Sequence, residues 1–123
     1  RWEWWVGGLW LLGWGVFGFP RDLFAAPQLS RIEWVPELHK PTDMIFNFVY
    51  YVAFGLLASR LGLHPRAALG LGAVCSAITE TSQVFSLQRN PSATDVVVNV
   101  AGTLMGVWLV TRRGALREVG RQL

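Results

Sequence analysis

Residues 43–61 read DMIFNFVYYVAFGLLASRL, a run of apolar side chains with one amide inside it and its first basic residue at Arg60. A helix of this length rises about 28 Å at 1.5 Å per residue, close to the ~30 Å hydrocarbon core of a bilayer. Residues 95–111, DVVVNVAGTLMGVWLVT, have the same character, with Asp95 at the start and Asn99 inside. Both stretches therefore predict membrane-spanning helices that carry an acid and an amide four residues apart, on one helical face.

Two further apolar stretches extend this pattern over the chain. Residues 4–19 are rich in tryptophan and glycine and end at Pro20, which lacks the N–H and the free φ that a helix interior needs. Residues 66–87 follow Pro65, a residue type favoured in the first turn of a helix. Because lipid cannot satisfy the backbone of an open strand and no period-two alternation is present, the sequence predicts an all-α polytopic membrane protein with four transmembrane helices in a bundle.

Composition excludes several classes of protein. The 123 residues are 52% hydrophobic and 15% charged, with a mean hydropathy of +0.34, so residues 1–123 are predicted to form a single transmembrane domain. Cys75 has no second cysteine, which excludes an intrachain disulfide and a cysteine-based metal cluster, and no metal or cofactor is predicted. The pI near 9.8 comes from arginines at membrane edges rather than from a basic stripe with interleaved aromatics, so nucleic-acid binding is not predicted.

The positions of the basic residues predict the orientation. Arg60 and Arg66 flank the turn between the second and third stretches, and four more arginines lie in a basic tail, residues 112–123. Cytoplasmic segments carry the excess of basic residues, so this face is predicted to be cytoplasmic, with both termini on it, in the bacterial cytoplasmic (inner) membrane. The long loop, residues 20–42, and the connection over residues 88–94 then lie outside.

The long loop leaves two alternatives open. Its mixture of charges with Leu29, Ile32 and Trp34 fits a segment lying in the interface plane, and a solvated linker fits equally well. Ala25 and Ala26 after the first apolar stretch also permit a cleaved signal peptide. A retained first helix is favoured, because the stretch is rich in tryptophan and further spans follow.

Polar side chains recur every three or four residues on three of the four stretches, which places them on one face of each helix. Since lipid offers no partner for an amide or a carboxylate, the three faces are predicted to meet and close a polar pocket near the outer leaflet. Interhelical hydrogen bonding without any ligand is the structural alternative. The residues concerned are Asp43, Asn47 and Tyr50 or Tyr51; Ser76, Thr79, Glu80 and Gln83; and Asp95 and Asn99, followed by Gly102 and Gly106, whose small size permits close helix packing.

The connection between the last two stretches is dense in hydrogen-bonding groups. Pro91 breaks the helix, and Ser92 is positioned to cap the next one by accepting the backbone N–H of Thr94 or Asp95. Arg89 lies beside two carboxylates, either as their internal counterion or as a bidentate contact to a phosphate or carboxylate of a ligand.

The motif formed by these residues resembles that of the VanZ-like family of small bacterial membrane proteins. It runs Glu80-x2-Gln83-x-Phe85-x3-Arg89-x-Pro91-Ser92-x2-Asp95-x3-Asn99-x2-Gly102-x3-Gly106, with Asp43-x3-Asn47 upstream, and the resemblance covers residues 40–110. It implies a four-helix protein of the bacterial cell envelope, with founding members linked to low-level resistance to the glycopeptide teicoplanin. It also implies that the polar residues of the motif form the site, but it supplies no reaction.

The first functional hypothesis is a site for an amphiphile with a polar or anionic head, such as a membrane lipid or a lipid-linked envelope precursor. Whether such a site binds or reacts stays open. Burial and mutual repulsion separate the protonation of two neighbouring carboxyl groups, so Glu80 and Asp95 are the candidate catalytic acid and base. The candidate ligand-binding residues are Asp43, Asn47, Gln83, Arg89, Ser92 and Asn99.

The second hypothesis is a noncatalytic accessory subunit of a larger membrane complex, respiratory or photosynthetic for instance. Its support is the Trp-rich first stretch, where Trp10 and Trp14 lie deeper than an interfacial belt and are better placed against a partner than against lipid. Transport is a weaker third possibility, because four helices without an internal repeat leave little room for alternating access.

Overall fold

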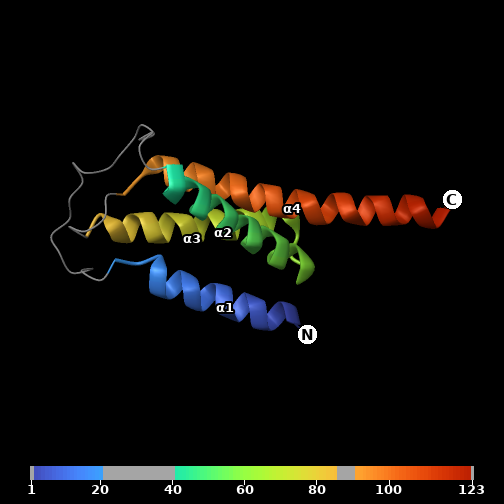
Figure 1. Ribbon diagram of the computed structural model, residues 1–123, viewed down its shortest axis with the longest axis horizontal. Helices are drawn as coiled ribbons and strands as arrows, with labels where there is room; N and C mark the ends of the chain where they lie inside the picture. The colour runs from blue at the N-terminus through green and yellow to red at the C-terminus, as the bar shows by residue number, and fades with distance from the viewer. Residues whose placement is uncertain (1, 21–40, 86–90, 123) are drawn as a thin grey trace.

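The computed structural model describes residues 2–20, 41–85 and 91–122, which form the helices α1 (Trp2–Phe17), α2 (Pro41–Arg60), α3 (Pro65–Gln83) and α4 (Ala93–Gln122). Successive helices run in opposite directions, so the N- and C-terminal ends of the chain lie toward the same end of the bundle (Figure 1). The all-α prediction is confirmed. The predictions made for Arg89 and for all but the ends of the long loop lie outside the described residues.

The contact between α2 and α4 is the most extensive in the bundle, and glycines make it possible. A Cβ placed on Gly102 would lie 2.5 Å from the carbonyl oxygen of Phe48, and one on Gly106 would lie 2.3 Å from that of Val52. Any larger residue at either position would push the backbones apart, as expected of small-residue packing between membrane helices. The close packing predicted for Gly102 and Gly106 is therefore confirmed.

The turn between α2 and α3 is defined by its own hydrogen bonds. The amide of Gly62 donates to the carbonyl of Ser59 at 3.1 Å, and that of Leu63 donates to the carbonyl of Ala58 at 3.0 Å. With Gly62 at φ +89°, this is the Schellman pattern that ends many helices at glycine. The predicted helix start at Pro65 is confirmed, and His64 caps it by accepting the Arg66 amide on Nδ1 at 3.3 Å.

Helix α1 is attached to α2 through Trp10. The indole Nε1 of Trp10 donates to the carbonyl of Tyr50 at 2.9 Å, while the hydroxyl of Tyr50 donates back to the carbonyl of Trp10. The two rings stack with their centroids 4.8 Å apart, and Trp10 is only 7% exposed. This deep tryptophan is therefore packed within its own chain, so its depth no longer argues for an external partner.

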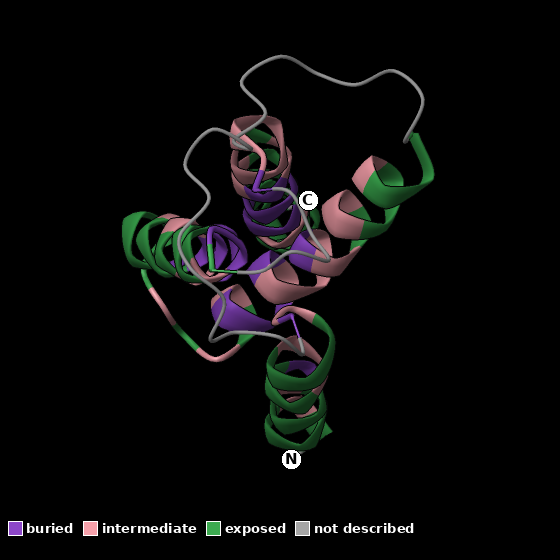
Figure 2. Cartoon of the chain, turned by 90° about the vertical axis from the view of Figure 1, so that its left-hand side faces the viewer, coloured by how far each residue is buried: buried purple, intermediate pink, exposed green. Residues whose placement is uncertain are grey.

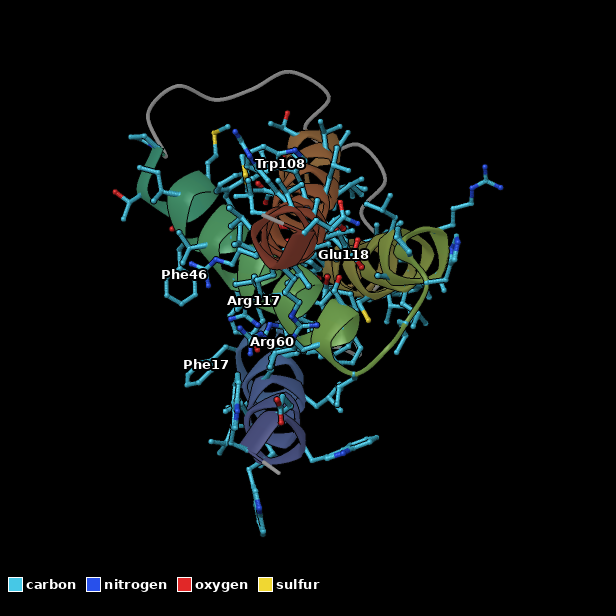
Figure 3. All side chains as sticks on the ribbon, turned by 90° about the vertical axis from the view of Figure 1, so that its right-hand side faces the viewer. Phe17, Phe46, Arg60, Trp108, Arg117 and Glu118 are labelled. Carbon is cyan, nitrogen blue, oxygen red and sulfur yellow. The ribbon has the colours of Figure 1, made fainter. Side chains whose placement is uncertain are left out.

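The boundaries of the last two helices differ from those predicted. Helix α3 ends at Gln83, four residues earlier than expected, because Val84 and Phe85 donate in turn geometry to the carbonyls of Thr81 and Ser82. Helix α4 continues well past residue 111 into the basic tail, whose residues 112–122 are all exposed. Viewed from the C-terminal end, Arg117 and Glu118 lie on this extension (Figure 3). The change from apolar to charged side chains at residue 112 marks the end of the apolar stretch but not the end of the helix, because arginine, leucine and alanine all favour helix.

Within the described ranges, two helices, α2 and α4, are long and apolar enough to cross a membrane, by length and composition alone. Helix α1 has only 16 residues, and α3 carries a run of hydroxyl, carboxyl and amide side chains in its second half. Four crossings therefore stay a prediction. The outer faces of all four helices are exposed (Figure 2), and they carry large apolar side chains such as Leu12, Phe46 and Val97, each more than 60% exposed. Such a continuous apolar exterior is unusual in a soluble protein and is expected of one surrounded by lipid.

Candidate functional site

All six buried polar or charged side chains of the described residues lie on two helices, α3 and α4. Lipid or protein interior offers such groups no water, so each needs a partner from a neighbouring helix or from a ligand. Their common location means that the α3–α4 contact is the polar centre of the molecule. The six, called the buried polar cluster below, are Ser76, Thr79, Glu80, Gln83, Asn99 and Thr103.

The inner part of the cluster is a short chain of hydrogen bonds. The side-chain amide Nδ2 of Asn99 donates to the hydroxyl of Ser76 at 2.9 Å, and the hydroxyl of Thr103 donates to the carbonyl of Asn99 at 3.0 Å. Ser76 and Thr103 are fully buried. The amide oxygen Oδ1 of Asn99 is also buried, yet no described residue donates to it. The site therefore offers an acceptor that its own side chains leave unused.

Glu80 forms the outer part of the cluster and connects α3 to the start of α4. Its Oε2 accepts the backbone amide of Ser92 at 2.8 Å, and the hydroxyl of Ser92 accepts the amide of Asp95 at 3.4 Å. The second contact confirms the predicted cap. In a capping box the acid three residues into the helix takes the amide of the capping residue, whereas here Glu80 from another helix takes it. A carboxylate at this position also interacts favourably with the positive end of the α4 dipole.

The outer part of the cluster lies toward the end of the bundle where α3 ends and α4 begins. This is the end opposite the chain termini (Figure 1), so the cluster and the basic extension of α4 are separated along the bundle axis. At the same end the backbone after α1 approaches α3, because a Cβ on Gly18 would lie 2.9 Å from the Cγ2 of Thr79. The cluster is therefore surrounded by α2, α3, α4 and the segment that follows α1.

A profile of the VanZ/LLP1 family matches residues 11–115. The chain belongs to the VanZ/LLP1 family. Comparison with curated proteins and comparison with solved structures each find no match. The matched region extends well before residue 40, so it includes the second half of α1, for which the sequence showed no recognised motif.

The residues predicted from the VanZ-like motif fall into three groups. Glu80, Gln83 and Asn99 are buried in the cluster, with Ser92 and Asp95 half-buried at its outer edge. Asp43 is exposed in the first turn of α2, and Asn47 is half-buried one turn further on. Arg89 lies outside the described residues. The hydrogen bonds of Glu80 to Ser92 and of Asn99 to Ser76 join α3 to α4, and the binding roles of Asp43 and Asn47 stay predictions.

Three side chains at this VanZ-family site were missed or left undecided by the sequence. Thr103 has an obvious signal in hindsight, since it follows Asn99 by four residues. Of the two tyrosines, Tyr51 is the one turned inward, at 3% exposed, while Tyr50 is used to hold α1. Trp14 was considered only as a contact to an external partner, yet its indole nitrogen is buried beside the hydroxyl of Tyr51. No local pattern indicates which tyrosine or tryptophan of a Trp-rich helix faces a neighbour's polar side chain.

The chemistry available at the cluster is hydrogen bonding with one carboxyl group inside and a second at the edge. No group of three or more histidine, cysteine, aspartate or glutamate residues within the described ranges has the arrangement of a metal site. Hydroxyl, amide and carboxyl groups on facing helices suit the binding of a polar group from an otherwise apolar molecule. Glu80 and Asp95 both lie near the start of α4 and stay the candidate acid and base.

Proposed function

We propose that this VanZ/LLP1 protein is a four-span protein of the bacterial cytoplasmic membrane that binds the polar head of an amphiphile or lipid-linked envelope molecule in its buried polar cluster. The observation that carries the proposal is the concentration of buried polar side chains at α3 and α4, with the acceptor oxygen of Asn99 left without a donor among the described residues. Polar residues placed at membrane depth are costly and are typically retained for function.

The antiparallel arrangement supports the proposed topology. Both chain ends lie at one end of the bundle, as four crossings require, and Arg60, Arg66 and the arginines of the α4 extension gather toward that end. If that end is cytoplasmic, the outer edge of the cluster at Glu80 and Ser92 faces the outer leaflet, where envelope precursors are used. The teicoplanin resistance implied by the family resemblance is compatible with a ligand of this kind.

Glu80 also has a structural role, and the test must separate this role from ligand binding. Its bond to the Ser92 amide holds the start of α4, and an amide side chain at position 80 keeps an oxygen that can accept the same proton. Glu80→Gln therefore removes the charge while preserving the bond. Asp95→Asn likewise removes a carboxylate charge at the edge of the cluster, and Glu118→Gln on the exposed extension is the matched control.

The experiment purifies wild type and these three variants in mild detergent and measures the melting temperature and the retained lipid by mass spectrometry. We expect wild type and Glu118→Gln to retain the same lipid, and Glu80→Gln and Asp95→Asn to lose it while melting within a few degrees of wild type. Loss of lipid only in proportion to loss of stability contradicts the proposal and identifies the acids as structural.

A second candidate function, an accessory subunit of a larger complex, has one observation in its favour. The face of α1 opposite Trp10 exposes Trp4, Trp5 and Leu9, each more than 60% accessible. Two exposed tryptophans beside an apolar side chain form a surface that suits a protein partner. A polypeptide that copurifies in fixed stoichiometry and dissociates on Trp5→Ala supports this alternative.

A further inference from the structure

Two buried side-chain donors on the α1–α2 side of the cluster have no acceptor. The hydroxyl of Tyr51 and the indole Nε1 of Trp14 are both inaccessible, and neither makes a hydrogen bond of acceptable geometry with any described residue. Tyr51 as a whole is only 3% exposed. Buried polar groups in native proteins nearly always have a partner, so two adjacent exceptions require an explanation.

The two donors occupy the same place. The side chains of Trp14 and Thr79 lie within hydrogen-bond reach of the Tyr51 hydroxyl, and Cys75 and Glu80 are near enough to interact with it electrostatically. Thr79 already directs its own proton to the carbonyls of Cys75 and Ser76, at 3.1 and 2.8 Å. Tyr51 and Trp14 therefore bring their polar atoms together beside Thr79, on the α3 side of the buried polar cluster, from two other helices.

A further unused group, which belongs to the cluster itself, is an acceptor on α4. Asn99 donates to Ser76, one turn before Thr79 on α3, and its Oδ1 receives no proton from the described residues. The Cβ of Tyr51 packs at Gly102, one turn beyond Asn99 on α4. Two donors from α1 and α2 and one acceptor from α4 are thus without partners among the described residues, and a molecule that satisfies all three must both accept and donate hydrogen bonds.

We propose that Trp14 and Tyr51 are ligand-binding residues, and that the group they hold is a hydroxyl of an uncharged sugar head. This inference rests on the proposed function and specifies its ligand class. A hydroxyl oxygen accepts from Trp14 and Tyr51 while its proton, or that of a second hydroxyl, goes to the Asn99 oxygen. A phosphate or carboxylate at this point would lie near the Glu80 carboxyl, and it would have no proton to donate to the Asn99 oxygen. Helix α1 then contributes to the site through Trp14 as well as to the fold through Trp10.

The test compares the full chain in phosphatidylcholine nanodiscs with the same nanodiscs containing about one tenth monoglucosyl diacylglycerol or phosphatidylglycerol. The first added lipid supplies hydroxyls without charge, and the second supplies hydroxyls on an anionic head. Retained lipid is measured after transfer to detergent, and the melting temperature is measured in the nanodiscs. The variants are Tyr51→Phe and Trp14→Phe, with Tyr50→Phe as the control because the Tyr50 hydroxyl is bonded to α1 and not to the cluster.

We expect the glucolipid to be retained and to raise the melting temperature of the wild type. Tyr51→Phe and Trp14→Phe should each weaken its retention by about tenfold, the effect of one lost hydrogen bond. Tyr50→Phe should lower the melting temperature but keep the lipid.

Three results overturn the inference. One is a Tyr51→Phe variant that melts higher than wild type in every membrane and retains the glucolipid unchanged, which identifies the hydroxyl as an unsatisfied group without a ligand. Another is retention of phosphatidylglycerol alone. The third is destabilisation by Tyr51→Phe with no response to either lipid, which identifies internal water as the partner. Failure of the proposed function is distinct, because there Glu80→Gln and Asp95→Asn lose lipid only in proportion to their loss of stability.

Discussion

Gly55 of α2 and Gly106 of α4 meet backbone to backbone. A Cβ on Gly106 would lie 2.9 Å from the Cα of Gly55, and one on Gly55 would lie 3.1 Å from the Cα of Gly106 and 2.2 Å from the carbonyl oxygen of Thr103. The same approach brings Thr103, and with it the buried polar cluster, against the centre of the bundle. Packing between two glycines therefore positions the polar residues of α4.

The first prediction concerns this contact. Gly106→Leu should destabilise the protein by about 3 kcal/mol or more, because the new side chain has to displace the backbone of α2, and overpacking of well-packed sites costs about 1 to 3 kcal/mol even where side chains can move. Gly114→Leu is the control on the same helix, since a Cβ there meets no atom within 4 Å. Thermal unfolding in detergent measures both. Equal melting temperatures for the two variants contradict the contact.

The sequence predicted the close packing of Gly106 but not its partner on α2, Gly55. The Gly102-x-x-x-Gly106 pattern predicts a close helix neighbour, but pairing with Gly55 depends on the crossing of α2 and α4, which no local pattern contains. Similarly, helical spacing correctly predicted that Ser76, Glu80 and Asn99 lie on the inward faces of their helices, because the residues recur with the period of an α-helix. Asp43 has the same spacing relative to Asn47, but it lies at the exposed start of α2. Helical period identifies residues on one face, whereas the depth at which each helix begins decides which of them are buried.

The length of α4 shows a related limit. A hydropathy pattern ends where charged residues begin, and the predicted span ended at residue 111 for that reason. Backbone hydrogen bonding continues as long as the residues tolerate helix, and it continues here to Gln122. Hydropathy indicates whether a segment of helix is surrounded by lipid or by water, whereas helix propensity indicates how far along the chain the helix continues.

The second prediction concerns the turn between α2 and α3. Gly62→Ala should cost about 1 to 2 kcal/mol, because an L side chain at a left-handed position brings its Cβ close to the next carbonyl. Gly70→Ala is the control, since Gly70 lies exposed within α3 with no atom near a Cβ, and helix propensity favours alanine there. We therefore expect opposite shifts in melting temperature. A stabilising Gly62→Ala would show that the turn adopts another conformation.

The third prediction separates the two tryptophan faces of α1. Trp10→Ala should detach α1 from α2 and lower the melting temperature strongly, because it removes a buried ring that stacks on Tyr50 and bonds its carbonyl. Trp5→Ala removes an exposed ring, so the isolated protein should melt almost unchanged. Protease sensitivity of the segment between α1 and α2 provides an independent measurement. If Trp5→Ala is the more destabilising change in the isolated protein, α1 packs on α2 by its other face.

The last prediction concerns topology, on which the outer-leaflet location of the site depends. In a Cys75→Ala background, a single cysteine at Thr42, exposed at the start of α2, should react with a membrane-impermeant maleimide added to intact cells. A cysteine at Gly114, on the α4 extension beside Arg112 and Arg113, should react only after the membrane is permeabilised, because the positive-inside rule places that extension in the cytoplasm. Both sites are open in the structure, so a difference in labelling reports the side of the membrane rather than burial. If Gly114→Cys is labelled from outside and Thr42→Cys is protected, the orientation is the reverse of the predicted one, and Glu80 and Ser92 lie toward the cytoplasm. Labelling of both from the same side contradicts the three crossings, by α2, α3 and α4, that the four-span bundle places between the two sites.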